Sequence, residues 1–244
     1  MRTIRSFIDA PLTVGHELLL PEQSSNHIVR VLRLDLGDSF HVFNGDGFDY
    51  VAEVISVEKK CTKVRILRRI AINNESPLNI HLYQSIARGD KMDWILQKAT
   101  ELGVTAFTPI VSDRTEVKLD GERSDKKLSH WQGVIRSACE QSGRAFIPPV
   151  HTPISINQLS INLKTAQAFY LEPAAKLCIK DLTIQTSQEL HLAIGPEGGF
   201  SERDIRLLET ASFQCLRIGP RILRTETAGL AVIAALQSQF GDWA

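Results

Sequence analysis

A glycine-rich segment, residues 194–200 with the sequence IGPEGGF, is the first candidate for chemistry in this chain. It follows a short apolar run and precedes Ser201, a residue type that often begins helices, so the pattern predicts a turn between a buried strand and a helix. In an open α/β sheet, ligands bind beyond the carboxyl ends of the strands, and glycine lets a ligand approach the backbone. The segment therefore indicates a ligand-binding loop, although a plain tight turn with a solvated Glu197 fits the same pattern.

A second unusual loop, residues 218–228 with the sequence IGPRILRTETA, also lies between a predicted strand and a predicted helix. Its arginines, Arg221 and Arg224, fit an ordinary hydrated surface loop. Ile222 and Leu223 are apolar, however, and need cover, which the core, a bound ligand or a crossing of the chain would supply.

Charged residues recur at four-residue spacing toward the end of the long helix predicted over residues 124–142. Arg136, Glu140 and Arg144 would share one face of that helix, either as a functional group or as an ordinary surface ladder of ion pairs.

Residues 59–69, with the sequence KKCTKVRILRR, carry six basic side chains and no acidic one. In an extended strand, Lys59, Lys63, Arg65 and Arg69 would share one face while Val64 and Ile66 point to a core. Such a face suits phosphate contacts, and it also suits a solvated edge strand that charge keeps soluble.

Two kinds of element must position these residues. The first 70 residues read as short strands around an Asn44-Gly45-Asp46-Gly47 turn signal, with one short helix, and predict a small β-barrel. After a polar, turn-prone linker at residues 71–77, strands alternate with helices, which indicates a parallel α/β sheet covered on both faces. Its predicted strands are 79–86, 104–111, 168–171, 190–194 and 214–218, and its helices are 91–102, 124–142, 201–211 and 225–240.

Composition and missing motifs exclude several classes of protein. Lys and Arg total 28, as do Asp and Glu, so the net charge is zero and the chain is not a globally basic nucleic-acid binder. Phosphate-loop, dinucleotide-turn, nucleophile-elbow and His-Glu-x-x-His motifs are absent, and the seven histidines and four cysteines lack metal-ligand spacing, so no metal is expected. The longest apolar stretch, residues 228–236, is too short for a membrane span, and the first 14 residues do not fit a signal peptide. We expect a cytoplasmic protein with reduced cysteines.

Five segments, in this order, resemble the RsmE family of SPOUT RNA methyltransferases, which methylate N3 of a uridine in 16S ribosomal RNA. They are HIVRVLR (27–33) with Gly37-Asp38, KMD (91–93) continuing through Lys98 to Val104, ACEQSGR (138–144), IGPEGGF (194–200) and RILRTETA (221–228). The chain departs from the family at His130, where a basic residue is expected.

The resemblance implies an α/β protein with two domains: a PUA-like β-barrel that binds RNA over residues 1–72, and a SPOUT methyltransferase domain with a deep trefoil knot over residues 73–244. It also implies a homodimer, with the apolar helix 225–240 as the candidate contact, and 16S rRNA within the small ribosomal subunit as substrate. S-adenosyl-L-methionine would lie in the knot, against three strand ends that contribute Leu171, Glu172, Ile194, Gly195, Glu197, Gly198, Ile218 and Leu223. The expected RNA contacts are Arg5, Arg30, Arg33, Lys63 and Arg65.

The implied reaction needs a cation, because uridine N3 must lose a proton and the resulting charge spreads onto the flanking oxygens. Arg224 is the first candidate for that role, and Arg144 and Arg136 are the second. Glu140 or Glu226 would orient an arginine, or would act as base if burial raised the pKa of the carboxyl.

Two alternatives remain open. One is a non-catalytic RNA-binding module, and the other is a knotted methyltransferase that acts on ribose 2′-oxygen or on guanine.

Overall fold

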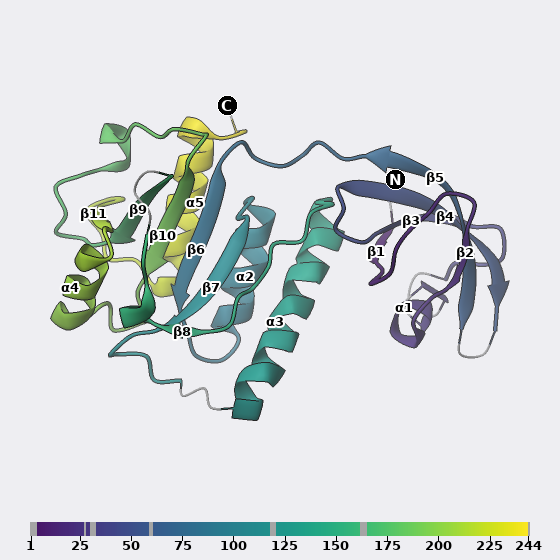
Figure 1. The fold of residues 1–244 in the computed structure, drawn as a ribbon, viewed down its shortest axis with the longest axis horizontal. Coiled ribbons are helices and arrows are strands. Elements are labelled where there is room, and N and C mark those ends of the chain that lie inside the picture. The colour runs from purple at the N-terminus through teal and green to yellow at the C-terminus, as the bar shows by residue number, and fades with distance from the viewer. Residues whose placement is uncertain are drawn as a thin grey trace. The chain divides into compact units, whose positions relative to one another are not determined.

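The computed structural model describes residues 4–26, 28–29, 33–58, 61–117, 121–161 and 165–243. They fall into two compact units (Figure 1). The N-terminal unit takes the chain up to Glu75 together with Cys139–Ile147, and the C-terminal unit takes Ser76–Ala138 and the chain from Pro148 onward.

The N-terminal unit is built on a five-stranded sheet with the order β1-β3-β4-β5-β2. Alternate residues of the long strands, including Tyr50, Val54, Val64 and Ile66, bury their side chains in one apolar core, as a period of two predicts. The elements are β1 (Arg5–Phe7), β2 (Glu17–Leu19), α1 (Glu22–Asn26), β3 (Ser39–Phe43), β4 (Phe48–Val57) and β5 (Thr62–Ala71).

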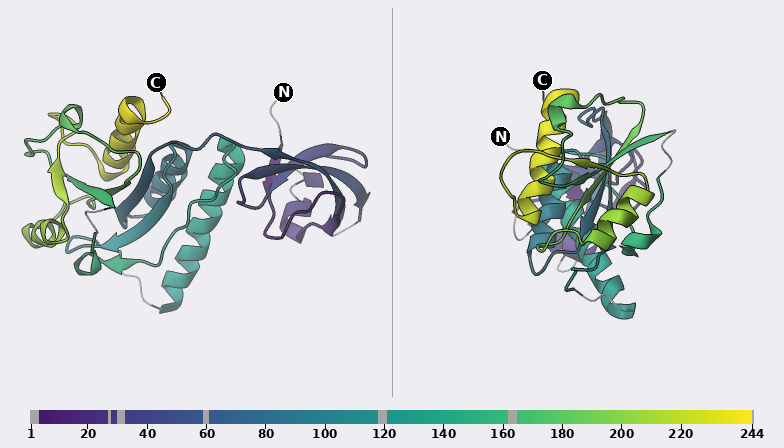
Figure 2. Two further views of the ribbon diagram at one scale, coloured as in Figure 1. Left: turned by 45° about the horizontal axis from the view of Figure 1, so that its top comes forward. Right: turned by 90° about the vertical axis from the view of Figure 1, so that its left-hand side faces the viewer.

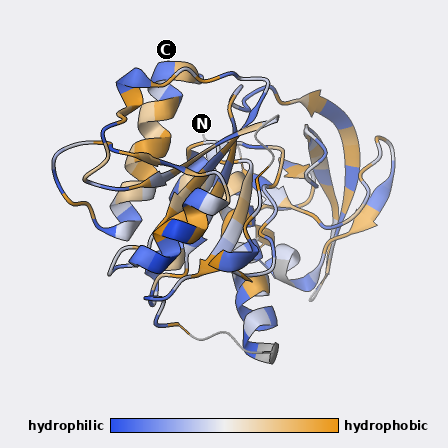
Figure 3. Cartoon of the chain, turned by 60° about the vertical axis from the view of Figure 1, so that its left-hand side comes forward, coloured by the Kyte–Doolittle hydropathy of each residue, from blue (hydrophilic) through white to orange (hydrophobic). Residues whose placement is uncertain are grey.

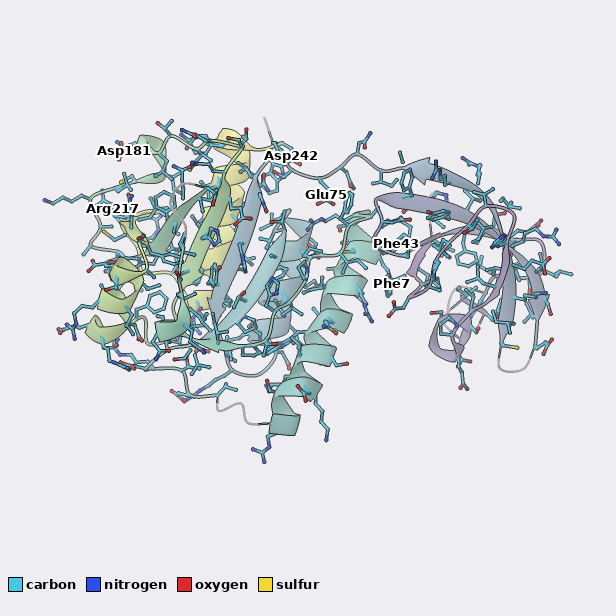
Figure 4. The ribbon with its side chains drawn as sticks, in the orientation of Figure 1. Phe7, Phe43, Glu75, Asp181, Arg217 and Asp242 are labelled. Carbon is cyan, nitrogen blue, oxygen red and sulfur yellow. The ribbon has the colours of Figure 1, made fainter. Side chains whose placement is uncertain are left out.

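The segment Cys139–Ile147 joins this unit, whereas the sequence predicted a single division at residues 72 and 73. The Arg5 guanidinium donates to the main-chain oxygens of Cys139 at 2.7 Å and of Arg144 at 3.1 Å. The main-chain N–H of Phe7 donates to the Glu140 carboxylate at 2.8 Å, and the Phe7 ring packs edge-on against Phe43 (Figure 4). These contacts fix the segment Cys139–Ile147 to β1. The local sequence contains no pattern that predicts them.

The C-terminal unit contains a six-stranded parallel sheet with the order β11-β9-β10-β6-β7-β8. Its apolar strands are typical of a sheet covered on both faces. The strands are β6 (Asn79–Ser85), β7 (Ala106–Val111), β8 (Ile154–Ser155), β9 (Ala166–Leu171), β10 (Glu189–Ile194) and β11 (Gln214–Leu216). The helices are α2 (Lys91–Glu101), α3 (Gly121–Ser142), α4 (Glu202–Thr210) and α5 (Thr225–Phe240), with short 3₁₀ turns η2 (Ile156–Gln158) and η3 (Ile179–Asp181).

Helices α4 and α5 lie on opposite faces of this sheet (Figure 2). One face packs Tyr83, Tyr170 and Ala193 against Leu208 of α4 and against Phe213, which follows that helix. The other face meets α5, which is apolar over most of its length (Figure 3). This two-faced cover is what leaves the carboxyl ends of the strands open for a site.

A polar row crosses the α4 face at the N-terminal half of the sheet. The rings of His81 and Tyr83 stack with centroids 4.3 Å apart, and His191 Nδ1 lies 3.1 Å from the Tyr83 hydroxyl. Burial, followed by the nearby His191 and His151, lowers the pKa of His81 to about 3. His81 is therefore neutral near pH 7 in the folded chain.

Among the residues that the structure describes, no helix combines the length and the apolar character that a membrane crossing needs. The same residues contain no group of three or more His, Cys, Asp or Glu side chains that could hold a metal ion.

Candidate active site at the carboxyl ends of three strands

A cavity of about 150 Å³ lies where β9, β10 and β11 end. Three loops enclose it, one after each strand, and the first turn of α5 closes one side. Seven of the eight residues that the resemblance assigned to the cofactor line this cavity: Leu171, Glu172, Ile194, Gly195, Glu197, Ile218 and Leu223.

Residues 195–201 form the loop after β10, called here the glycine loop. The main-chain N–H of Gly199 donates to the Pro196 carbonyl at 2.9 Å, and Gly199 has a φ of 68°, which favours glycine. A Cβ atom on Gly195 would lie 3.2 Å from the Phe200 nitrogen. A side chain at Gly195 would therefore crowd the main chain of the loop itself, with or without a ligand.

The eighth residue, Gly198, is not among the residues that line the cavity. A Cβ atom at this position would lie 3.3 Å from Cδ of Arg114, a residue in the loop after β7. The expectation that Gly198 makes room for a cofactor is therefore not supported by its position.

Two residues that were not predicted from the sequence, Thr225 and Gln84, hold the glycine loop through hydrogen bonds. The hydroxyl of Thr225 donates to the Gly195 carbonyl at 2.6 Å, and the side-chain amide of Gln84 donates to that hydroxyl oxygen at 3.0 Å. Both side chains are buried. The available signal was Gln84, a polar residue that follows the apolar Ile80 and Leu82 at alternate positions of the strand.

Glu197 is held by residues that follow β6. Its Oε1 atom lies 3.1 Å from Lys91 Nζ and accepts the main-chain N–H of Arg88 at 3.4 Å. The same ammonium lies 3.7 Å from Glu226 Oε2. Partial burial opposes the charge on Glu197, but main-chain N–H groups and Lys91 outweigh it and keep the pKa of this carboxyl below its usual value. Glu197 therefore presents a negative charge to the cavity at neutral pH.

The arginine-rich loop contributes Arg221, Ile222 and Leu223 to the lining. Ile222 is 86% exposed, so the core does not cover it in this chain. Arg224 stands directly before α5, is exposed, and is not among the lining residues. The predicted arginine-rich loop therefore lies at the cavity. Arg221 lines the cavity, whereas Arg224 follows the lining residues in the chain without lining it.

The predicted charged residues near the end of α3 have contacts of a structural kind. Arg144 is 4% exposed, and its Nε donates to Glu75 at 3.0 Å, which ties the linker to the end of the helix. Glu140 accepts the Phe7 N–H in the same N-terminal unit. Arg136 is half-buried on the part of α3 that belongs to the C-terminal unit. Catalytic roles for Glu140 and Arg144 are not supported by these positions.

The predicted RNA contacts divide into buried and exposed residues. Arg5 forms a two-pronged ion pair with Asp49 at 2.6 and 2.9 Å, and the exposed fractions of the two side chains are 7% and 4%, so Arg5 does not present its charge to a phosphate. Lys63 and Arg65 are exposed and share Glu17, at 2.6 and 2.7 Å. Arg33 is exposed, and Arg30 lies outside the described residues.

The predicted basic face of β5 is interrupted. A register shift opposite Val51 and Ala52 places Arg69 beside Tyr50, whose side chain is in the core, whereas Arg65 lies beside Glu53 on the outer face. Arg69 therefore does not share a face with Arg65, because the bulge inserts one extra residue.

Two family models match this chain. One for the RNA methyltransferase domain covers residues 74–237, and one for the RNA methyltransferase PUA domain covers residues 20–67. With a cavity at the strand ends of the α/β unit, the fold is that of an RNA methyltransferase with an N-terminal PUA domain.

Individual relatives show to which family of RNA methyltransferases the chain is similar in sequence and structure. The chain is 35% identical to ribosomal RNA small subunit methyltransferase E of Bacillus subtilis, with 88% of this chain and 87% of that protein covered. It is 38% identical to a ribosomal RNA small subunit methyltransferase E from Neisseria gonorrhoeae bound to S-adenosyl methionine, with a TM-score of 0.92 and full coverage of both chains. A putative methyltransferase from Legionella pneumophila, also with bound cofactor SAM, is 39% identical, with a TM-score of 0.94 and coverage of 99% and 100%. The chain belongs to the ribosomal RNA small subunit methyltransferase E family.

Proposed function

We propose that this protein transfers a methyl group from S-adenosyl-L-methionine to N3 of a uridine in the 16S rRNA of the small ribosomal subunit. The observation that carries the proposal is the cavity at the ends of β9, β10 and β11, in a chain whose relatives from Neisseria and Legionella hold this cofactor. The ribosomal substrate places its action in the cytoplasm.

The lining of the cavity fits such a cofactor. Main-chain groups of three loops are available for adenine and ribose, and the carboxylates of Glu172 and Glu197 suit a ligand with a sulfonium and an ammonium group. Ile194, Ile218 and Leu223 supply apolar contact. When bound, the cofactor supplies an electrophilic methyl group. Gly195, Gln84 and Thr225 hold the loop that faces it.

The chain must also assist the loss of the N3 proton. Arginine stays protonated in proteins, so it stabilises a developing anion without giving up a proton. Arg224 remains the first candidate because the loop to which it belongs lines the cavity. Arg221 is the cavity-lining alternative that the structure adds. Arg136 stays a candidate from α3 on the sequence alone.

RNA binding is assigned to the PUA domain. Arg33 and Arg65 are exposed, 43% of the Lys63 side chain is exposed, and Arg30 is a candidate from the sequence alone. Phosphate contacts of this kind release counterions, so RNA affinity should fall steeply with salt concentration.

The C-terminal domain is proposed to contain the trefoil knot. β11 lies at the sheet edge beyond β9, yet α5, which follows β11, contacts α2 and β10. The connection between them must therefore return past the end of β9 to reach β10. This return supports a threaded chain.

A homodimer is proposed on the evidence of α5. Gly229, Val232, Ile233 and Leu236 are buried within the chain. The remaining apolar positions are only half-buried and offer a face of small side chains to a second copy: Leu230, Ala231, Ala234 and Ala235. Light scattering should therefore give twice the chain mass of 27.2 kDa.

Calorimetric titration with S-adenosyl-L-methionine tests the enzyme against the alternative of a bare RNA-binding module. The proposal predicts one binding event per chain and methyl transfer to small-subunit RNA. A protein that binds RNA but gives no heat with the cofactor would be the non-catalytic module.

A further inference from the structure

The loop after β7 grips the glycine loop through one side chain, Arg114. Its Nη1 atom donates to the Gly198 carbonyl at 2.6 Å and lies 3.4 Å from the Phe200 carbonyl. Both oxygens belong to the main chain of the loop that lines the cavity, while Arg114 itself is not among the lining residues. The contacts of this side chain therefore reach the cavity through the main chain of the loop.

The neighbouring residues hold this loop at the start of α4. The main-chain N–H of Asp113 donates to Asp204, a fully buried carboxylate, at 3.1 Å. The Ser201 hydroxyl donates to the Asp113 carboxylate at 2.7 Å, and the Ser201 oxygen in turn accepts the Asp204 N–H at 3.0 Å. These hydrogen bonds fix the main chain next to Arg114 relative to the end of the glycine loop.

Gly198 gives the arginine its space. The Cβ of any other residue would stand 3.3 Å from Arg114 Cδ, which is closer than most Cβ contacts, so the arginine side chain would have to shift. The φ of Gly198 lies outside the left-handed region, so an alanine could adopt the backbone without strain. Glycine at this position is therefore explained by the arginine, and no ligand contact is needed to explain it.

We propose that Arg114 is a positioning residue that presets the glycine loop for the cofactor, with Gly198 as the residue that admits it. This inference rests on the proposed cofactor binding at the cavity. Without the guanidinium, the two carbonyls hydrogen-bond to water and the loop adopts other conformations. The ligand must then order the loop as it binds, which costs binding free energy. A lysine offers a point charge on a shorter reach and restores the grip only in part.

Titration of the full-length protein with S-adenosyl-L-methionine tests this role. Arg114→Ala should raise the dissociation constant about fivefold to tenfold, and Arg114→Lys should raise it less. The turnover number at saturating cofactor should stay within about twofold of wild type, because the loop is then ordered by the ligand. The matched control is Arg206→Ala, which removes an exposed arginine of α4 that pairs with Glu202 one turn away; its dissociation constant should not change.

Gly198→Ala separates the two explanations of this glycine. If its Cβ meets Arg114, the substitution should weaken cofactor binding about threefold in the wild-type background and have no effect in the Arg114→Ala background. An equal loss in both backgrounds would mean that the Cβ meets the cofactor, and the proposal would be wrong. Wild-type affinity in Arg114→Ala would also overturn it, whereas a wild-type protein that binds no cofactor would refute the proposed function instead.

Discussion

Replacing Arg5 by methionine separates a structural role from an RNA-binding role for this residue. The substitution keeps most of the side-chain volume but removes a guanidinium that pairs with Asp49 through two bonds, at 2.6 and 2.9 Å. It also removes a donor from the Cys139 carbonyl and a cation 4.4 Å from the centre of the Phe43 ring.

The burial of the pair sets the size of the effect. With only 7% and 4% of the two side chains exposed, Asp49 would be left as a buried carboxylate whose remaining side-chain partner is His41 Nδ1 at 3.1 Å. Loss of one partner of a buried ion pair costs about 3–5 kcal/mol of stability. Lys63→Met is the matched control, because Lys63 and Glu17 are exposed by 43% and 33%. An exposed pair of this kind contributes less than about 1 kcal/mol.

Hydrogen exchange of the intact protein, read from peptides that span β3, β4 and β5, gives the opening free energy of the N-terminal unit. The expected result is a loss of about 3 kcal/mol or more for Arg5→Met and little change for Lys63→Met. Refutation would be an Arg5→Met protein with wild-type protection and weakened RNA affinity, since that pair of results belongs to a surface phosphate contact.

Two further perturbations test the support of the site and the sheet. Thr225→Val removes the hydroxyl that links Gln84 to the Gly195 carbonyl, so it should cost about 2 kcal/mol of stability and weaken cofactor binding several-fold. The control Thr227→Val changes an exposed position of the same helix and should do neither. Equal melting and binding curves for the two variants would contradict the assigned link. Because the folded-state pKa of His81 is lowered to about 3, the unfolded chain takes up a proton below about pH 6.5 that the folded chain does not, and stability falls as the pH drops through that window. Between pH 7 and pH 5, the unfolding free energy of His81→Gln, measured in urea, should therefore fall by about 2 kcal/mol less than that of wild type. Identical pH profiles would show that His81 does not cause the acid sensitivity.

Local signals in the sequence were enough to predict the elements around the cavity. The apolar run, the glycines and Ser201 predicted a strand, a loop and a helix, and the structure confirms all three, with a capping box of Ser201 and Asp204 at the start of α4. The alternation of strands and helices likewise predicted a parallel sheet, which the structure confirms.

The partners of charged residues could not be predicted in the same way. Arg5 and Arg144 read as surface cations, but their partners Asp49 and Glu75 lie 44 and 69 positions away along the chain. Burial of such a pair depends on tertiary packing, which no periodicity records. The same limit applies to Gly198, because a glycine motif does not say which neighbour would meet the missing Cβ.

The most direct test of the account is the identity of the methylated nucleoside. Purified protein is incubated with S-adenosyl-L-methionine and small ribosomal subunits from a strain that lacks this methylation, and the 16S rRNA is digested to nucleosides for mass spectrometry. The account predicts 3-methyluridine as the product, formed only when protein and cofactor are both present. A 2′-O-methylated nucleoside, a methylguanosine or no modification at all would contradict it.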